Sequence, residues 1–256
     1  NPNDGAQRKP GPIRNRAVTD IFEPGSSFKP FVVAAALESG RYQADSLIDT
    51  SPGFVKVSDS VVIEDPNNLG EIDVTTVLAK SSNVGMTKIA LELGQQDLWT
   101  VLSDFGIGRS TTSGFPGESS GVLTDFQHWR PVGQATLSYG YGVSVTALQL
   151  ARAYATVAAG GIFRPVSVRV VRDPLPVERV ISSATSAALL DMLEIVVSVG
   201  SGSLASVPGF RVAGKTGTAK KSGVGGYSEE KYIAIFAGIA PVTKPKLVVV
   251  VVIDEP

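Results

Sequence analysis

The spacing of apolar residues along the chain changes character towards its C-terminal end. In the earlier part, apolar residues recur at helical intervals, and several of these segments stop at a glycine. In the last part, short runs rich in Val and Ile replace them, which favours strands. The predicted helices cover residues 31–37, 73–80, 84–93, 96–105, 146–159 and 183–199, and the predicted strands cover 210–219, 231–240 and 246–254.

The three predicted strands are consecutive, and a Gly- and Ser-rich loop joins the first two. Strands connected this closely most simply pair as an antiparallel meander. We expect the valine run 248–252 to form a buried central strand. A helix-rich middle followed by such a sheet predicts an α/β protein of the α+β type, without a doubly wound parallel sheet. No internal repeat or domain boundary is visible, so we expect one domain over residues 1–256.

The first residues of the chain differ from the rest. Residues 1–20 are rich in Pro, Asn, Arg and Gly, which predicts an extended polar segment. They show neither the basic start nor the apolar stretch of a signal peptide. No apolar run in the sequence approaches the roughly 18 residues that a membrane span needs.

Three short polar clusters interrupt the apolar elements and are candidates for chemistry. The first is Ser26-Ser27-Phe28-Lys29, directly before a predicted helix that is apolar nearly all round and therefore buried. Residues three apart share a helix face, so the Ser26 hydroxyl and the Lys29 amine can meet. Pro30 suits only the first turn of a helix, which places Ser26 at the helix N-terminus, where backbone N–H groups favour a developing negative charge.

The other two clusters each have a structural and a functional interpretation. Ser81-Ser82-Asn83 lies between two predicted helices, where Ser and Asn commonly cap the next helix but can also project into one cleft. Lys215-Thr216-Gly217-Thr218 lies in a predicted strand, where a lysine can protect a sheet edge and a glycine often marks the close approach of another backbone. The residues alone leave both alternatives open at each cluster.

The composition excludes several kinds of partner and reactive site. Of 256 residues, 23 are Lys or Arg and 24 are Asp or Glu, and this near-neutral balance argues against nucleic acid as the main partner. The chain has no Cys, which excludes disulfides, zinc-thiolate sites and thiol catalysis, and its one histidine, His128, excludes multi-His metal sites. We therefore expect no metal and no organic cofactor, and we expect His128 to be a surface loop residue.

A serine nucleophile needs a base nearby, and with His128 set aside Lys29 has to serve. The pKa of Lys29 would have to fall by about 3 units from its usual value to act at neutral pH. Burial and a second cation both lower the pKa of a lysine, and Lys215 is the natural second cation.

In this order, S-x-x-K, S-x-N and K-T-G resemble the signature of penicillin-interacting serine enzymes. The stretches 14–26, 80–85, 139–142 and 215–219 are similar to those of class B penicillin-binding proteins of the division-specific penicillin-binding protein 3 type. The resemblance implies an antiparallel sheet flanked by helices, with a helical subdomain. It also implies that this transpeptidase domain is truncated at both ends, because the family's first two sheet strands and its final helix lie beyond residues 1–256.

The resemblance implies a D,D-transpeptidase that cross-links peptidoglycan at the division septum. Its substrates would be stem peptides ending in D-Ala-D-Ala, and β-lactams would acylate it as substrate mimics. The whole protein would be anchored in the inner membrane with its catalytic domain facing the periplasm, and it would meet division proteins through regions outside this chain.

Each site residue then has an expected role. Ser26 is the nucleophile, Lys29 its base, Ser81 the proton relay to the leaving D-Ala, and Asn83 orients Lys29 and the substrate amide. The backbone N–H groups of Ser26 and Thr218 hold the oxyanion. The residues expected to bind the substrate are Lys215, Thr216, Gly217, Thr218 and Tyr141, with Gly217 lying against the substrate backbone and Tyr141 flanking it.

Three related functions remain as alternatives. A β-lactamase shares the Ser, Lys and K-T-G motifs but needs a base for the deacylating water, and the sequence has no E-x-x-L-N segment of that kind. A β-lactam sensor domain would be acylated and would then signal. A D,D-carboxypeptidase differs only in transferring the acyl group to water.

Overall fold

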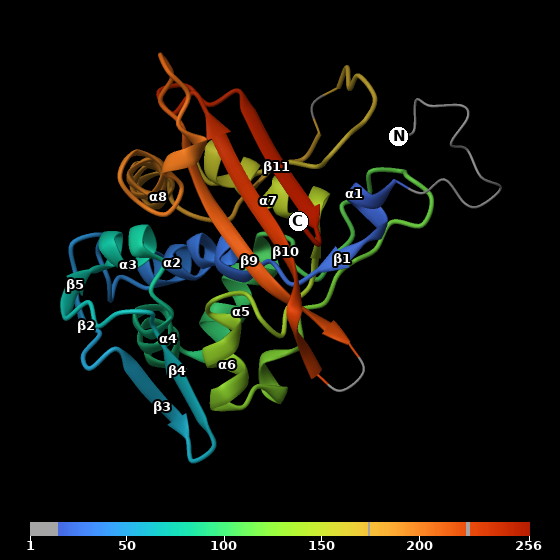
Figure 1. Cartoon of the computed structure of the whole chain (residues 1–256). Coiled ribbons are helices and arrows are strands. Elements are labelled where there is room, and N and C mark those ends of the chain that lie inside the picture. Colours follow the sequence, from blue (N-terminus) through green and yellow to red (C-terminus); the bar gives the residue numbers. More distant parts are fainter. Residues whose placement is uncertain (1–14, 174, 224–225) are drawn as a thin grey trace.

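The computed structural model describes residues 15–173, 175–223 and 226–256 of the chain (Figure 1). Its α-helices are α1 (Arg16–Thr19), α2 (Lys29–Glu38), α3 (Val74–Lys80), α4 (Asn83–Glu92), α5 (Gln95–Asp104), α6 (Pro131–Leu137), α7 (Ala147–Ala158) and α8 (Ser183–Ser198). Short 3₁₀ turns are η2 (Gly25–Phe28), η3 (Phe126–His128) and η4 (Ser203–Ala205). The six predicted helices are confirmed. The extended segment predicted for 1–20 is wrong at 16–19, which form α1, and its first fourteen residues lie outside the described ranges.

The main sheet consists of β9 (Ala213–Gly223), β10 (Gly226–Ala240) and β11 (Leu247–Asp254), paired antiparallel in the order β11-β10-β9. The predicted meander is therefore confirmed. Four small pairs complete the strands: β1 (Ile21–Phe22) with β6 (Val145–Thr146), β2 (Leu47–Asp49) with β5 (Glu71–Asp73), β3 (Phe54–Ser58) with β4 (Val61–Glu64), and β7 (Ile162–Phe163) with β8 (Glu178–Arg179). The mixed architecture agrees with the predicted α+β class.

The prediction of a buried central strand at 248–252 is wrong. In the described part of the sheet β10 is central and β11 is an edge strand. Its residues alternate between two environments: Val249 and Val251 are about half exposed, whereas Val248, Val250 and Val252 pack against the core. A continuous apolar run predicts burial on both faces, but the position of a strand within the sheet depends on which partners pair with it.

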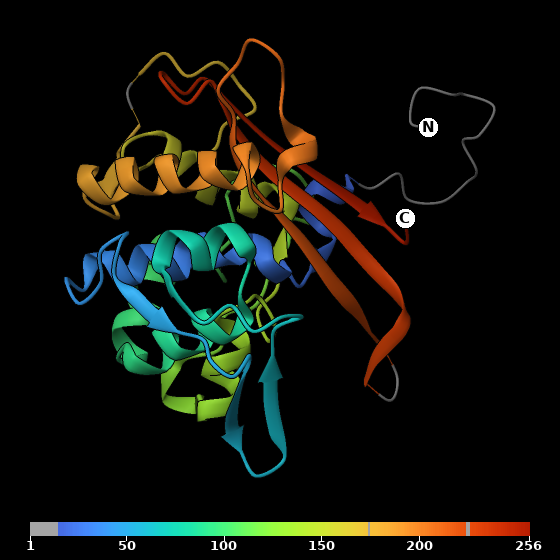
Figure 2. The same ribbon diagram turned by 60° about the vertical axis from the view of Figure 1, so that its left-hand side comes forward.

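Helix α2 lies at the centre of the molecule, between the sheet layer and a lobe built from α4, α5 and α6 (Figures 1 and 2). On the sheet side, α7 packs on β10 and β11, and α8 packs on β9. On the other side, α2 contacts α4 and α5. This central position explains why α2 is apolar nearly all round, since each of its faces meets another element.

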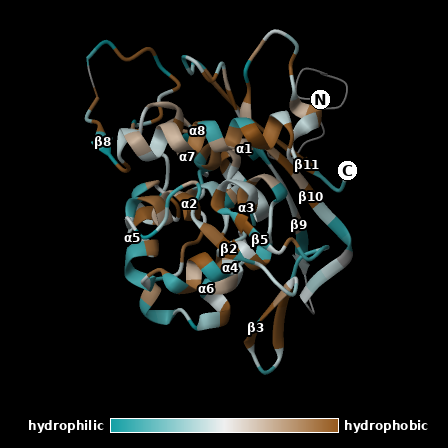
Figure 3. Ribbon diagram, turned by 90° about the vertical axis from the view of Figure 1, so that its left-hand side faces the viewer, coloured by the Kyte–Doolittle hydropathy of each residue, from teal (hydrophilic) through white to brown (hydrophobic). Residues whose placement is uncertain are grey.

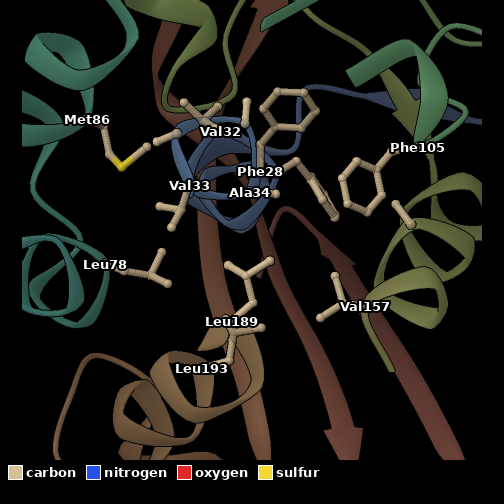
Figure 4. Packing of buried hydrophobic residues seen from close by; sticks show 14 of the residues in the cluster. Phe28, Val32, Val33, Ala34, Leu78, Met86, Phe105, Val157, Leu189 and Leu193 are labelled. Atoms are coloured by element: carbon tan, nitrogen blue, oxygen red, sulfur yellow. The ribbon is translucent and has the colours of Figure 1, made fainter. Parts of the chain in front are cut away.

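The core around α2 is close-packed (Figure 4). Phe31 is fully buried, with its ring centroid 5.0 Å from that of Phe105 and 5.3 Å from that of Tyr154. Burying one such aromatic side chain contributes about 2–3 kcal/mol. The fixed core holds the first turn of α2 in place, and with it the residues that precede the helix.

The β3–β4 hairpin projects away from this core, and parts of it are coloured hydrophobic in Figure 3. Phe54 and Val62 on this hairpin are about half exposed. Within the described residues, no helix combines the length and the apolar character needed to cross a membrane.

Candidate active site

Ser26 lies in the tight turn η2, which runs directly into α2. Gly25 precedes it with φ +51°, a backbone conformation that glycine adopts without strain, and the Gly25 N–H donates to the Gly140 carbonyl at 3.2 Å. Pro30 occupies the first turn of α2, as predicted. The hydroxyl of Ser26 therefore stands at the N-terminal end of a buried helix.

Strand β9 passes directly against this turn. A Cβ atom added at Gly217 would lie 2.7 Å from the Pro24 carbonyl oxygen and 3.0 Å from the Ser27 nitrogen. A Cβ atom added at Gly25 would lie 2.7 Å from the Thr218 carbonyl oxygen. The predicted close backbone approach at Gly217 is present, and the backbone that it approaches is the Ser26 turn. The expected contact of Gly217 with the substrate backbone stays a prediction. Glycine is needed here to bring Thr218 beside Ser26.

Lys29 is fully buried and bonds to the Ser81–Asn83 segment. Its Nζ donates to the Ser81 carbonyl at 2.5 Å, to the Ser81 hydroxyl at 3.1 Å and to the Asn83 Oδ1 at 2.8 Å. Among the described residues, the structure gives no hydrogen bond between the Lys29 amine and the Ser26 hydroxyl. The Lys29 amine bonds to the S-x-N segment in place of the expected contact with Ser26.

The Ser81–Asn83 segment combines both interpretations that the sequence left open. Ser82 is the N-cap of α4, and its hydroxyl accepts from the Gly85 N–H at 2.8 Å. Ser81 and Asn83, on either side of it, turn towards Lys29. Ser81 has φ +60°, an uncommon conformation for a residue with a side chain, as often found at functional sites.

Lys215 on β9 completes the convergence of the three motifs. It is also fully buried, and its Nζ donates to the Ser81 hydroxyl at 3.0 Å and to the Ser201 hydroxyl at 3.3 Å. Strand β9 is an edge strand in the described part of the sheet, but Lys215 points into the protein, so its interpretation as a solvent-exposed edge lysine is wrong. The Ser81 hydroxyl thus lies between two buried amines from distant parts of the sequence.

Comparison with known proteins agrees with this arrangement. The family model described as "Penicillin binding protein transpeptidase domain" matches residues 1–256. This chain belongs to that family. A solved structure, the apo TP domain from Burkholderia pseudomallei penicillin-binding protein 3, has a TM-score of 0.90 and 44% sequence identity, covering 95% of this chain and 74% of that one.

Two relatives are named for their reaction. Peptidoglycan D,D-transpeptidase FtsI of Escherichia coli (strain K12) is 43% identical over 100% of this chain and 43% of its own length. Probable peptidoglycan D,D-transpeptidase PenA of Neisseria gonorrhoeae is 39% identical over 95% of this chain and 42% of its own length. The chain therefore spans less than half the length of these relatives.

The two lysines of this penicillin-binding domain have unusual acid–base properties. Burial, and then the charge of Lys215, hold the pKa of Lys29 well below its usual value. Burial lowers the pKa of Lys215 to about 8. A buried amine loses the hydration that stabilises its charged form, and a neighbouring cation acts in the same direction. The lowered pKa shifts Lys29 towards its neutral form, the form that a base requires.

A cleft of about 580 Å³ opens beside Ser26, and Asn83, Thr218 and Tyr141 also line it. The Tyr141 ring lies 5.7 Å from that of Tyr139 and 5.3 Å from that of Tyr227, both edge-on, which gives the cleft an aromatic wall. Thr216 is one residue from Lys215, with its hydroxyl 3.4 Å from that of Ser201. His128 lies in η3, is exposed and is absent from the cleft lining.

Sequence reasoning missed two contributors to the site. Ser201, in the loop after α8, reaches both Lys215 and Thr216, and its N–H donates to the Ala79 carbonyl at 3.1 Å. Tyr227, on β10, donates its hydroxyl to Glu23 at 2.9 Å. Neither position belongs to a motif that signals chemistry, and each joins the site only because its segment folds back against another.

Proposed function

We propose that this chain is the catalytic domain of a serine D,D-transpeptidase, which cross-links peptidoglycan stem peptides during septal cell-wall synthesis through an acyl-enzyme on Ser26. The observation that carries the proposal is the meeting of two buried amines, Lys29 and Lys215, on the Ser81 hydroxyl beside the Ser26 turn. Membership of the penicillin-binding transpeptidase family and the names of the relatives support it.

In the acylation step, the Ser26 oxygen attacks the carbonyl carbon of the penultimate D-Ala of a stem peptide. Neutral Lys29 accepts the hydroxyl proton. The bond to the terminal D-Ala nitrogen then breaks, and the same proton passes through Ser81 to that nitrogen, so that D-Ala leaves as a free amino acid. The hydrogen bonds from Lys29 and Lys215 to Ser81 support this relay. The Ser26–Lys29 contact would form when substrate binds, since catalytic hydrogen bonds often tighten only in the complex.

The remaining groups stabilise charge on the substrate. The backbone N–H groups of Ser26 and Thr218 would hold the oxyanion, and the close packing of Gly25 on the Thr218 carbonyl supports their proximity. The substrate carboxylate would bind to Lys215, Thr216 and Thr218, which offer a cation and two hydroxyls. Tyr141 would flank the peptide from the aromatic wall.

In the second step, the amine of another stem peptide attacks the acyl-enzyme, forming the cross-link and returning a proton to Ser26 through the same groups. A β-lactam would acylate Ser26 in the first step, and its ring-opened product would stay attached and block the second. We further propose that the whole protein is anchored in the inner membrane with this domain in the periplasm, where it would meet division proteins. The relatives' name as peptidoglycan D,D-transpeptidases supports a site of cell-wall synthesis.

The test is intact-protein mass spectrometry with a labelled penicillin, followed over hours. We expect one adduct on Ser26, absent in Ser26→Ala. The adduct should be present in Ser167→Ala, a control at an exposed serine between β7 and β8. Label that persists in Ser26→Ala would refute the assignment. Rapid loss of the adduct would indicate a β-lactamase. With a D-Ala-D-Ala peptide and an amine acceptor, a cross-linked product indicates a transpeptidase, hydrolysis alone a carboxypeptidase, and the absence of both products a sensor.

A further inference from the structure

A carboxylate from a different part of the chain caps the segment that carries Ser81 and Asn83. Asp65 follows β4 and is 18 residues away from Asn83 in sequence. Its Oδ1 accepts the N–H of Asn83 at 2.5 Å and the N–H of Val84 at 3.2 Å. Its Oδ2 accepts the hydroxyl of Ser82. Three donors at the start of α4 therefore converge on one side chain.

These bonds fix the groups that hold Lys29. The Asn83 backbone bonded to Asp65 carries the amide oxygen that accepts from Lys29 Nζ at 2.8 Å. The preceding residue, Ser81, keeps its strained backbone at φ +60° while its carbonyl and hydroxyl also bond Lys29. Ser81 adopts this conformation as the C-cap of α3, where its N–H donates to the Leu78 carbonyl at 3.2 Å. The bonds from Ser82 and Asn83 to Asp65 anchor the other side of the same turn.

Asp65 is itself held in place. Its N–H donates to the Gly53 carbonyl at 2.9 Å, which ties it to the turn before β3. The residue before it, Glu64, pairs with Phe54 in the β3–β4 hairpin. The Asp65 carboxylate thus joins the base of the projecting hairpin to the site.

We propose that Asp65 is a positioning residue for the acylation step: it fixes the Ser81–Asn83 turn and, through it, the amine of Lys29. This inference rests on the proposed function. It adds to that function a residue that lies outside all three motifs.

Asp65 acts on Lys29 through its charge as well as through the hydrogen bonds that fix the turn. Two charged groups face the buried amine: Lys215 from β9, which lowers the pKa of Lys29 in addition to the larger effect of burial, and Asp65, which raises it. The other groups bonded to the amine, Ser81 and Asn83, are uncharged. Removing the negative charge should therefore lower the pKa of Lys29 further, so that the amine becomes neutral at a lower pH.

Asp65→Asn separates charge from geometry, because the amide oxygen can still accept from the Asn83 and Val84 N–H groups. We expect the acid limb of the acylation rate against pH to move to lower pH, with the maximal rate within a few-fold of the parent's. Asp65→Ala also removes the acceptor. Since displacing a reacting group by about 1 Å costs on the order of 10²-fold in rate, we expect a loss of up to that size.

The matched control is Asp59→Asn, the same change on the same hairpin at an exposed aspartate that pairs with Lys56. It should leave both the maximal rate and the pH profile unchanged. If circular dichroism shows that Asp65→Ala does not fold, the acylation rate of Asp65→Asn against pH is the test of the inference. With an acylated parent, a folded Asp65→Ala variant that is acylated at the parental rate, or an unchanged acid limb in Asp65→Asn, would overturn the inference. A parent that is not acylated at all would instead overturn the proposed function.

Discussion

Two polar clusters in this protein show opposite uses of burial and hydrogen bonding. In the site, Lys29 and Lys215 are enclosed with few compensating charges, and burial lowers the pKa of each. In the loop between α5 and α6, Glu118 accepts four hydrogen bonds, from the N–H and hydroxyl groups of Thr111 and Ser113. Burial opposes the charge of Glu118 too, but these donors outweigh it and lower its pKa to about 2.

The difference separates a reactive cluster from a structural one. The donors around Glu118 stabilise its charged form, so the cluster holds a loop together in one state. The enclosure of the lysines destabilises their charged form, which favours the neutral amine that can accept a proton. A shifted pKa alone therefore does not identify a functional group. A shift that disfavours the charged form points to reactivity, whereas one that favours it points to a structural role.

Replacing the proposed base should have the largest effect. In Lys29→Met the amine is gone, and we expect the rate of acylation by labelled penicillin to fall about 10²- to 10⁴-fold, the usual contribution of a general base. Lys56→Met, at an exposed lysine paired with Asp59, is the control and should react at the parental rate. Acylation of Lys29→Met at the parental rate would show that Lys29 is not the base and that the lysine cluster is not the reactive one.

A smaller effect is expected from Gly217→Ala, which tests how tightly β9 must lie on the Ser26 turn. The new Cβ would meet the backbone at Pro24 and Ser27, which cannot move aside as a flexible side chain can. We expect a loss of about 1–3 kcal/mol in the free energy of unfolding and acylation slowed by about 10-fold.

Gly223→Ala on the same strand is the matched control for Gly217→Ala, since nothing lies within 4 Å of its added Cβ. It should change the free energy of unfolding by less than about 0.5 kcal/mol. Equal behaviour of the two variants in thermal unfolding and acylation would show that the close approach is dispensable.

The smallest effect concerns the structural cluster. Because the pKa of Glu118 is about 2 in the folded protein and about 4.3 in an unfolded chain, its charge stabilises the fold above pH 4.3, and this contribution is lost as the pH falls towards 2. After allowance for solvent screening, Glu118→Gln should lose about 1–2 kcal/mol of unfolding free energy at pH 7.

Chemical denaturation of Glu118→Gln between pH 2 and 7 checks both the size and the sign. The difference from the parent should shrink as the pH falls through 4, and acylation at pH 7 should be unaffected. A difference that grows at low pH, or a slowed acylation, would contradict the assignment of this cluster to structure alone.

Local features of the sequence were the most predictable. Asp73 caps α3 by accepting from the Thr76 N–H at 2.6 Å, and Thr146 and Gln149 form the predicted capping box of α7. These interactions join residues three apart, so the sequence contains both partners within one turn. The motifs S-x-x-K, S-x-N and K-T-G and their order could likewise be recognised from the sequence, because each motif occupies a few adjacent positions.

Non-local features were not predictable in the same way. The valine run 248–252 carried the correct strand propensity, but its edge position depends on its pairing partners. Ser201 and Asp65 occupy ordinary loop positions, and their contacts with Lys215 and with the start of α4 arise from packing across 14 and 18 residues of sequence. Such contacts leave no periodic pattern along the chain.

The sequence by itself determined which chemical groups are available: a serine before a buried helix, two lysines, an S-x-N segment, and no cysteine. The tertiary structure alone decided what those groups can do. It buries Lys29 and Lys215 on one hydroxyl, draws β9 against the Ser26 turn, and directs Asp65 to the segment that holds the amine. The reason is physical: composition fixes the intrinsic pKa and hydrogen-bonding capacity of each side chain, but desolvation and neighbouring charges exist only once distant segments are packed together.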